Sequence, residues 1–74
     1  MEHQEHKVIT YLKEALYSAP QGSRATIYCD DYTLADLPGI INDLYAEFKN
    51  PDIQIKDRVL RISGELKDDY IPTN

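Results

Sequence analysis

The chain of 74 residues has a single cysteine, Cys29, and no long run of apolar residues. One cysteine cannot form an internal disulfide bond, and without an N-terminal apolar run we expect neither a signal peptide nor a membrane span. Together these absences predict a soluble, cytoplasmic protein. A domain of this length buries roughly 60% of the surface of its unfolded chain, so we expect marginal stability unless association adds to it.

Basic residues are also outnumbered, because 8 lysines and arginines stand against 13 aspartates and glutamates and give a net charge of -5. This balance argues against nonspecific binding of the whole molecule to nucleic acid or to an anionic membrane. A local basic patch is still compatible with it. A short, acidic, cysteine-poor chain suits a prokaryotic or phage accessory protein, which is our compositional expectation.

The residue types that build active sites are sparse. Cys29 precedes Asp30 and Asp31, but a cysteine nucleophile needs a nearby base, and the two histidines, His3 and His6, lie at the start of the chain. The carboxylates also lack the D-x-D-x-D-G spacing of a calcium loop. We therefore expect no enzyme, no bound metal and no cofactor, and we expect Cys29 to be an inert core thiol.

The clearest structural signal is a pair of alternating segments near the C-terminus. Ile53 and Ile55 are followed, after a short polar connection, by Leu60 and Ile62. This period of two predicts a β-hairpin in which Ile55 lies opposite Leu60 and Ile53 lies opposite Ile62. One face of the hairpin is then aliphatic, and the other carries Gln54, Lys56, Val59 and Arg61.

Two amphipathic helices precede this hairpin. The first covers residues 5–17, and its apolar stripe is Val8, Ile9, Leu12, Ala15 and Leu16. The second is expected to begin at Thr33 or Asp36, to hold Pro38 in its first turn, and to end at Asn50-Pro51. Its expected buried stripe is Leu37, Ile40, Ile41, Leu44 and Phe48.

A strand is predicted between the two helices. Residues 18–23 contain proline and glycine and form a connection, and residues 24–29 alternate between small or apolar and polar side chains. The inward set is Ala25, Ile27 and Cys29, and the outward set is Arg24, Thr26 and Tyr28. Residues 1–64 are expected to form one compact domain, and residues 65–74 a flexible C-terminal tail.

These elements predict an α+β fold of order α-β-α-β-β, a two-layer sandwich with a three-stranded sheet and two helices on one face. The strand order stays open. A right-handed crossover would make the first two strands parallel neighbours, whereas a central third strand would make the sheet antiparallel. We expect both sheet edges to lack proline, which favours a homodimer formed by edge pairing. Leu44 and Ile55, at the centres of their stripes, should be fully buried.

One candidate binding surface is the sheet face away from the helices. It is expected to carry Arg24, Tyr28, Lys56 and Arg61, together with Thr26 and Gln54. It has three interpretations: an ordinary solvated face, a protein interface, or a single-stranded nucleic-acid site in which Tyr28 stacks on a base. Nucleic acid ranks third, because three cations are few beside the roughly 6–10 phosphate contacts that strong binding uses.

A second candidate surface is an acidic stripe on the second helix, formed by Asp36, Asp43 and Glu47. Asp43 and Glu47 are like charges one turn apart, an arrangement that costs a few tenths of a kcal/mol. A basic partner docked there would offset this cost, although a solubilising face is the simpler interpretation. The sequence thus favours a small non-catalytic binding or regulatory protein that docks to another macromolecule as a homodimer, with a single-stranded nucleic-acid binder as the alternative.

Overall fold

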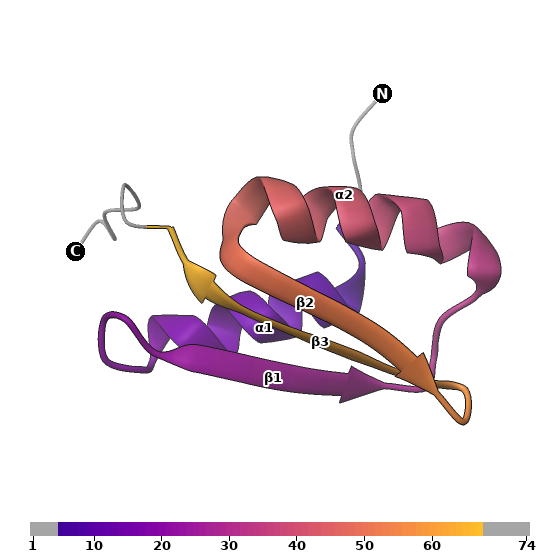
Figure 1. Ribbon diagram of the computed structural model, residues 1–74, viewed down its shortest axis with the longest axis horizontal. Helices are drawn as coiled ribbons and strands as arrows, with labels where there is room; N and C mark the ends of the chain where they lie inside the picture. The colour runs from indigo at the N-terminus through magenta and orange to yellow at the C-terminus, as the bar shows by residue number, and fades with distance from the viewer. Residues whose placement is uncertain (1–4, 68–74) are drawn as a thin grey trace.

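Figure 1 shows the computed structural model, which describes residues 5–67 of the chain. Its elements are α1 (Lys7–Tyr17), β1 (Arg24–Cys29), the 3-10 helix η1 (Leu34–Asp36), α2 (Leu37–Glu47), β2 (Phe48–Lys56) and β3 (Val59–Leu66). Two helices pack against one face of a three-stranded sheet, so the predicted α+β fold and its element order are confirmed.

Strand β3 occupies the middle of the sheet, in the order β1-β3-β2, and is antiparallel to both neighbours. Of the two strand orders that the sequence left open, the structure has the antiparallel one. The hairpin register is as predicted, with Ile55 opposite Leu60 and Ile53 opposite Ile62. The predicted bounds of the first strand also agree with those of β1.

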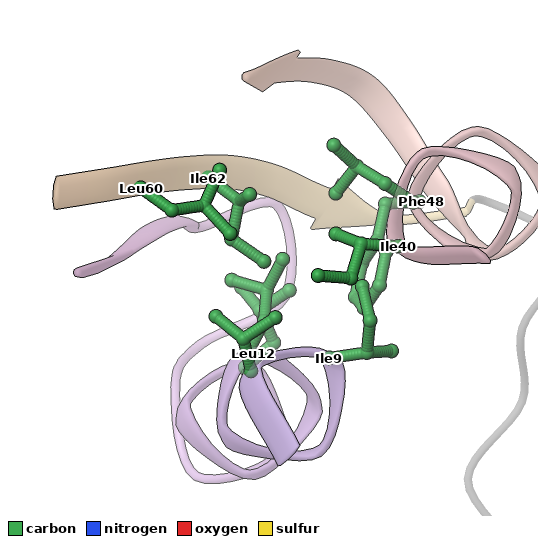
Figure 2. Close-up of a cluster of buried hydrophobic side chains, with 9 residues drawn as sticks. Ile9, Leu12, Ile40, Phe48, Leu60 and Ile62 are labelled. Carbon is green, nitrogen blue, oxygen red and sulfur yellow. The ribbon is translucent and has the colours of Figure 1, made fainter. Parts of the chain in front are cut away.

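The hydrophobic core lies between the sheet and the two helices (Figure 2). Its buried residues are Val8, Ile9, Leu12, Leu16, Ile40, Leu44, Phe48, Leu60 and Ile62. The prediction for Leu44 is confirmed, but Ile55 is 48% exposed and Ile41 is 41% exposed, so the prediction that both are buried was wrong. Ile55 has the same strand phase as Ile53, which packs against the core, but it lies beside the hairpin turn at the end of β2.

The junction between α2 and β2 differs from the prediction. Helix α2 ends at Glu47, and Phe48 has extended backbone angles and begins the strand opposite Leu66. Phe48 is still buried, because its position in the strand turns the side chain toward the helices. The helix therefore does not continue to Asn50-Pro51, which instead lies inside β2.

An irregularity in β2 accommodates this proline. The register shifts between Lys49 and Asp52, and Asn50 has a φ of 51°, in the left-handed region that asparagine tolerates better than most residues. Pro51 follows within an edge strand, where a missing N–H is acceptable. The expectation that both sheet edges lack proline was therefore wrong for β2.

Strand β3 is longer than predicted and continues to Leu66. Gly64 permits this close packing, because a Cβ atom at that position would lie 3.0 Å from the Cβ atom of Phe48. Glu65 and Leu66 thus belong to the sheet rather than to the expected tail. The end of that tail, residues 68–74, lies outside the described residues.

Candidate binding surfaces

The sheet face away from the helices, called here the open sheet face, carries the side chains that the sequence assigned to it. Tyr28, Arg61 and Gln54 occupy matching positions on β1, β3 and β2 and form a row across the sheet. Neighbouring strands lie about 4.8 Å apart, so these three side chains are adjacent. Tyr28 is 67% exposed. The row offers an aromatic ring, a guanidinium group and an amide side by side.

Carboxylates on the same face neutralise two of its cations. Arg24 lies 3.2 Å from Glu65 and also donates to the hydroxyl of Ser63 at 3.0 Å, and Arg61 lies 3.1 Å from Asp52. Sequence reasoning missed both carboxylates because it began the second strand after Asp52 and ended the third before Glu65. The open sheet face is therefore of mixed charge rather than simply cationic.

The acidic stripe of α2 faces helix α1. Glu47 lies 2.6 Å from the Nζ atom of Lys13, which also lies 2.5 Å from Glu5. Partial burial disfavours the lysine charge, but the hydrogen bonds to Glu47 and Glu5 outweigh this effect and raise the pKa of Lys13 above its ordinary value. Asp43 is buried. Part of this stripe thus has its basic partner within the same chain.

Asp36 is engaged at the start of α2. The backbone N–H of Thr33 donates to its carboxylate at 2.9 Å, and the Nε2 atom of His6 lies 3.5 Å from the same oxygen. The backbone hydrogen bond from Thr33 is the main reason that the pKa of Asp36 is lowered, and His6 adds to the effect. This arrangement ties the N-terminal ends of the two helices together.

His6 caps the first helix. Its Nδ1 atom accepts a hydrogen bond from the backbone N–H of Val8 at 3.1 Å, and its Nε2 atom is directed to Asp36. Both ring nitrogens of His6 thus face groups at the starts of the two helices. His6 therefore has a structural role, because it caps the first turn of α1 and contacts Asp36.

A depression of about 440 Å³ lies beside this contact between the helix ends. It is lined by residues 5–7 and by Ala35, Asp36, Gly39, Ile40 and Asp43. Within residues 5–67, no group of three or more His, Cys, Asp or Glu side chains is placed to hold a metal ion.

Cys29 is the last residue of β1 and is partly buried against the core. Its Sγ atom lies 3.6 Å from the carbonyl oxygen of Asp31. The carboxylate of Asp31 binds the ammonium group of Lys7, which lowers the pKa of Asp31 and raises the pKa of Lys7. The contact joins the segment after β1 to the first turn of α1.

Comparison with protein-family models, with curated proteins and with solved structures finds no match to this chain. Neither helix in the described part of the chain is long and apolar enough to cross a membrane. The chemistry of its own surfaces is therefore the basis for a functional proposal.

Proposed function

We propose that this protein is a small non-catalytic binding protein that docks to another protein through its open sheet face. The observation that carries this proposal is the row of Tyr28, Arg61 and Gln54, in which two thirds of Tyr28 is exposed on a face that no described element covers. Tyrosine and arginine are enriched among the residues that dominate binding energy in protein interfaces. An aromatic ring fixed on a strand also loses little conformational freedom on binding.

The charges of this face favour a protein partner over single-stranded nucleic acid. Asp52 and Glu65 lie beside Arg61 and Arg24, where a phosphate backbone would have to approach. These carboxylates would repel phosphates, whereas a protein surface can offer both acidic and basic groups in complementary positions. The partner that fits best presents carboxylates toward Lys56 and hydrogen-bonding groups toward the row of Tyr28.

The acidic stripe gives weaker support for docking. Glu47 is bound to Lys13, and Asp36 is bound to Thr33 and lies near His6. A basic partner would have to displace these contacts within the chain. On the open sheet face, a partner can contact Tyr28, which is 67% exposed, while the pairs Arg61–Asp52 and Arg24–Glu65 stay in place.

Affinity capture from native lysate with a matched pair of variants tests the proposal. Tyr28→Ala should lose a protein that the wild type retains, whereas Tyr11→Ala should keep it, because Tyr11 is a half-exposed tyrosine that lies on α1, across the molecule. Circular dichroism would verify that both variants fold. Equal retention by the two variants would count against the open sheet face.

An oligonucleotide experiment addresses the alternative function. We expect no retention of single-stranded oligonucleotides at physiological salt. A salt-sensitive submicromolar complex that is lost when Arg24, Lys56 and Arg61 are replaced together by glutamine would show that the face binds phosphates instead.

A further inference from the structure

Aliphatic and aromatic side chains are exposed along the β2 edge of the sheet, on the side of the molecule that contains α2. We call this region the aliphatic border. Ile55 of β2 and Ile41 of α2 are about half exposed, and Tyr45, one helical turn after Ile41, is 58% exposed. The opposite flank of α2, with Asp36 at its N-cap and Glu47 at its last residue, faces α1 and its N-cap His6. Ile41 and Tyr45 therefore border the free edge of β2, which lies on the α2 side of the sheet in Figure 1.

Within residues 5–67, the backbone of this edge has hydrogen-bonding groups without a strand partner, and their positions follow from the register. Asp57 and Arg58 both have positive φ values, 53° and 66°, as in the type I′ turn of a two-residue hairpin closed by Lys56 and Val59. Such a closing pair exchanges both of its hydrogen bonds, and the bonding then alternates along the strands. Lys56 and Gln54 thus bond to β3, whereas Ile53 and Ile55 direct their N–H and C=O groups away from the sheet.

We propose that a second copy of this chain binds here, with the two β2 strands antiparallel about a two-fold axis at Gln54. In this register Ile53 lies opposite Ile55 of the second copy, so the outward backbone groups of both strands meet. Asp52 lies opposite Lys56 of the second copy, so its carboxylate, which contacts Arg61 of its own chain, also faces an ammonium group, twice per dimer. Among the described residues Lys56 has no ion-pair partner within its own chain.

Other registers fit less well. An axis at Ile53 would place Pro51, which has no N–H, opposite Ile55, and an axis at Ile55 would place Asp57 opposite Ile53. A shift by one residue would move the aliphatic side chains of the second copy to the polar face. An axis at Ile55 would also place Asp52 opposite Arg58, but Arg58 lies in the turn beyond β2. The axis at Gln54 pairs opposite charges within β2 on one face and both isoleucines on the other. The self-complementary charges therefore identify a second copy as the occupant.

The β1 edge lacks comparable features. Its inward side chains, Ala25, Ile27 and Cys29, are packed against the core, and none of them is among the large exposed apolar residues. Arg24 already contacts Glu65. Edge pairing through β2 leaves Tyr28 uncovered but engages Lys56, so in the dimer a partner of the open sheet face would contact the row of Tyr28 rather than Lys56.

Sedimentation velocity over a concentration series is the first test. We expect a dimer at micromolar concentration, since the proposed contact adds backbone hydrogen bonds, two ion pairs and buried aliphatic surface. A protein that stays monomeric up to about 1 mM would overturn the proposal.

A charge exchange between two variants tests the register itself. Asp52→Lys and Lys56→Asp each place like charges opposite one another in their own homodimers, and we expect the dissociation constant of each homodimer to rise about tenfold or more. An equimolar mixture should form heterodimers, because every facing pair is then again of opposite charge. Native mass spectrometry separates the three dimers by mass. A statistical mixture without enrichment of the heterodimer would overturn the register.

Proline substitution tests which edge is used. Ile55→Pro removes an N–H that points away from β3, and Thr26→Pro removes the equivalent outward N–H of β1, because Ile27 and Cys29 are the residues that bond to β3. We expect Ile55→Pro to be monomeric and Thr26→Pro to remain a dimer. The reverse result would assign the interface to β1. If Ile55→Pro fails to fold, the charge exchange still decides the question.

Discussion

The half of the molecule that contains α1 and β1 and the half that contains η1, α2 and β2 expose different kinds of apolar residue. Around α1 and β1 the large exposed apolar side chains are all tyrosines, whereas around η1, α2 and β2 they include aliphatic residues. The tyrosines are Tyr11, Tyr17 and Tyr28, and the aliphatic residues are Leu34, Ile41 and Ile55. A tyrosine hydroxyl hydrogen-bonds to water, whereas an exposed aliphatic side chain gains stability only when it is covered.

The way each helix is connected explains this difference. Residues 18–23 separate α1 from β1 and allow α1 to lie over both β1 and β3. Helix α2 has no such connection, because its C-cap, Phe48, is already the first residue of β2. Because α2 runs directly into β2, the helix is held over this edge strand. The flank of α2 that faces away from α1 then extends past the edge of the sheet. The exposed border is thus a consequence of the chain's topology rather than of loose packing.

The largest expected effect contrasts the buried and exposed parts of the α2 side. Leu44→Ala should reduce the free energy of unfolding by about 2–5 kcal/mol, because Leu44 is fully buried and the change leaves a cavity. Ile55→Ala should cost less than about 1 kcal/mol in the monomer, because half of that side chain is already in water. Urea unfolding below the dimerisation concentration measures both. Equal costs would mean that Ile55 is as well covered in solution as Leu44.

Ile55 also shows how far sequence could predict this fold. Alternation is a local property, so the bounds of β1 and the hairpin register followed directly from it. The exposure of Ile55 depends on where α2 lies over the sheet, which no local pattern contains. Phe48 is a related case, because it is four residues after Leu44 and an inward residue is expected there in either a helix or a strand.

The candidate surfaces show the same limit. The polar side chains of the open sheet face were predicted from strand alternation alone. Their neutralisation by Asp52 and Glu65 was missed, because both residues lay outside the expected strands. The angular position of the acidic stripe was likewise inferred from helical periodicity, but its pairing with Lys13 depends on the packing of α1 against α2.

A smaller effect is expected from two glycines on the α2 side. Gly64→Ala should cost about 1–3 kcal/mol, because the added Cβ atom would lie 3.0 Å from that of Phe48 and the backbones would have to separate. Gly39→Ala is the matched change in α2, where a Cβ atom meets nothing within 4 Å. It should stabilise the protein by about 0.5–1 kcal/mol through its higher helix propensity.

Thermal unfolding monitored by circular dichroism measures both glycine variants. The two variants compare the tight packing of Gly64 against Phe48 with the open surface of α2 at Gly39. A neutral Gly64→Ala would show that the junction of α2 and β2 is loosely packed, and it would weaken the argument that this junction fixes α2 over the edge strand.

The smallest expected effect concerns the turn at the exposed end of β2. Arg58 has a φ of 66°, a conformation that costs a non-glycine residue about 1 kcal/mol, and among the described residues its side chain has no hydrogen bond or ion pair. Arg58→Gly should therefore stabilise the hairpin by about 0.5 kcal/mol, after allowance for the greater freedom of glycine in the unfolded chain. Asp57→Gly should give a smaller gain, because aspartate tolerates the left-handed region better.

This turn variant also separates hairpin stability from edge pairing. Residues 57 and 58 lie outside the segment that pairs in the proposed dimer, so Arg58→Gly should raise the unfolding midpoint in urea while the dissociation constant measured by sedimentation stays the same. If the aliphatic border were exposed only because the hairpin is loose, a tighter turn would bury Ile55 and weaken the dimer. An unchanged dissociation constant in a more stable monomer would instead mean that the border is open because α2 is held at the edge, and that a second copy supplies what the fold leaves uncovered.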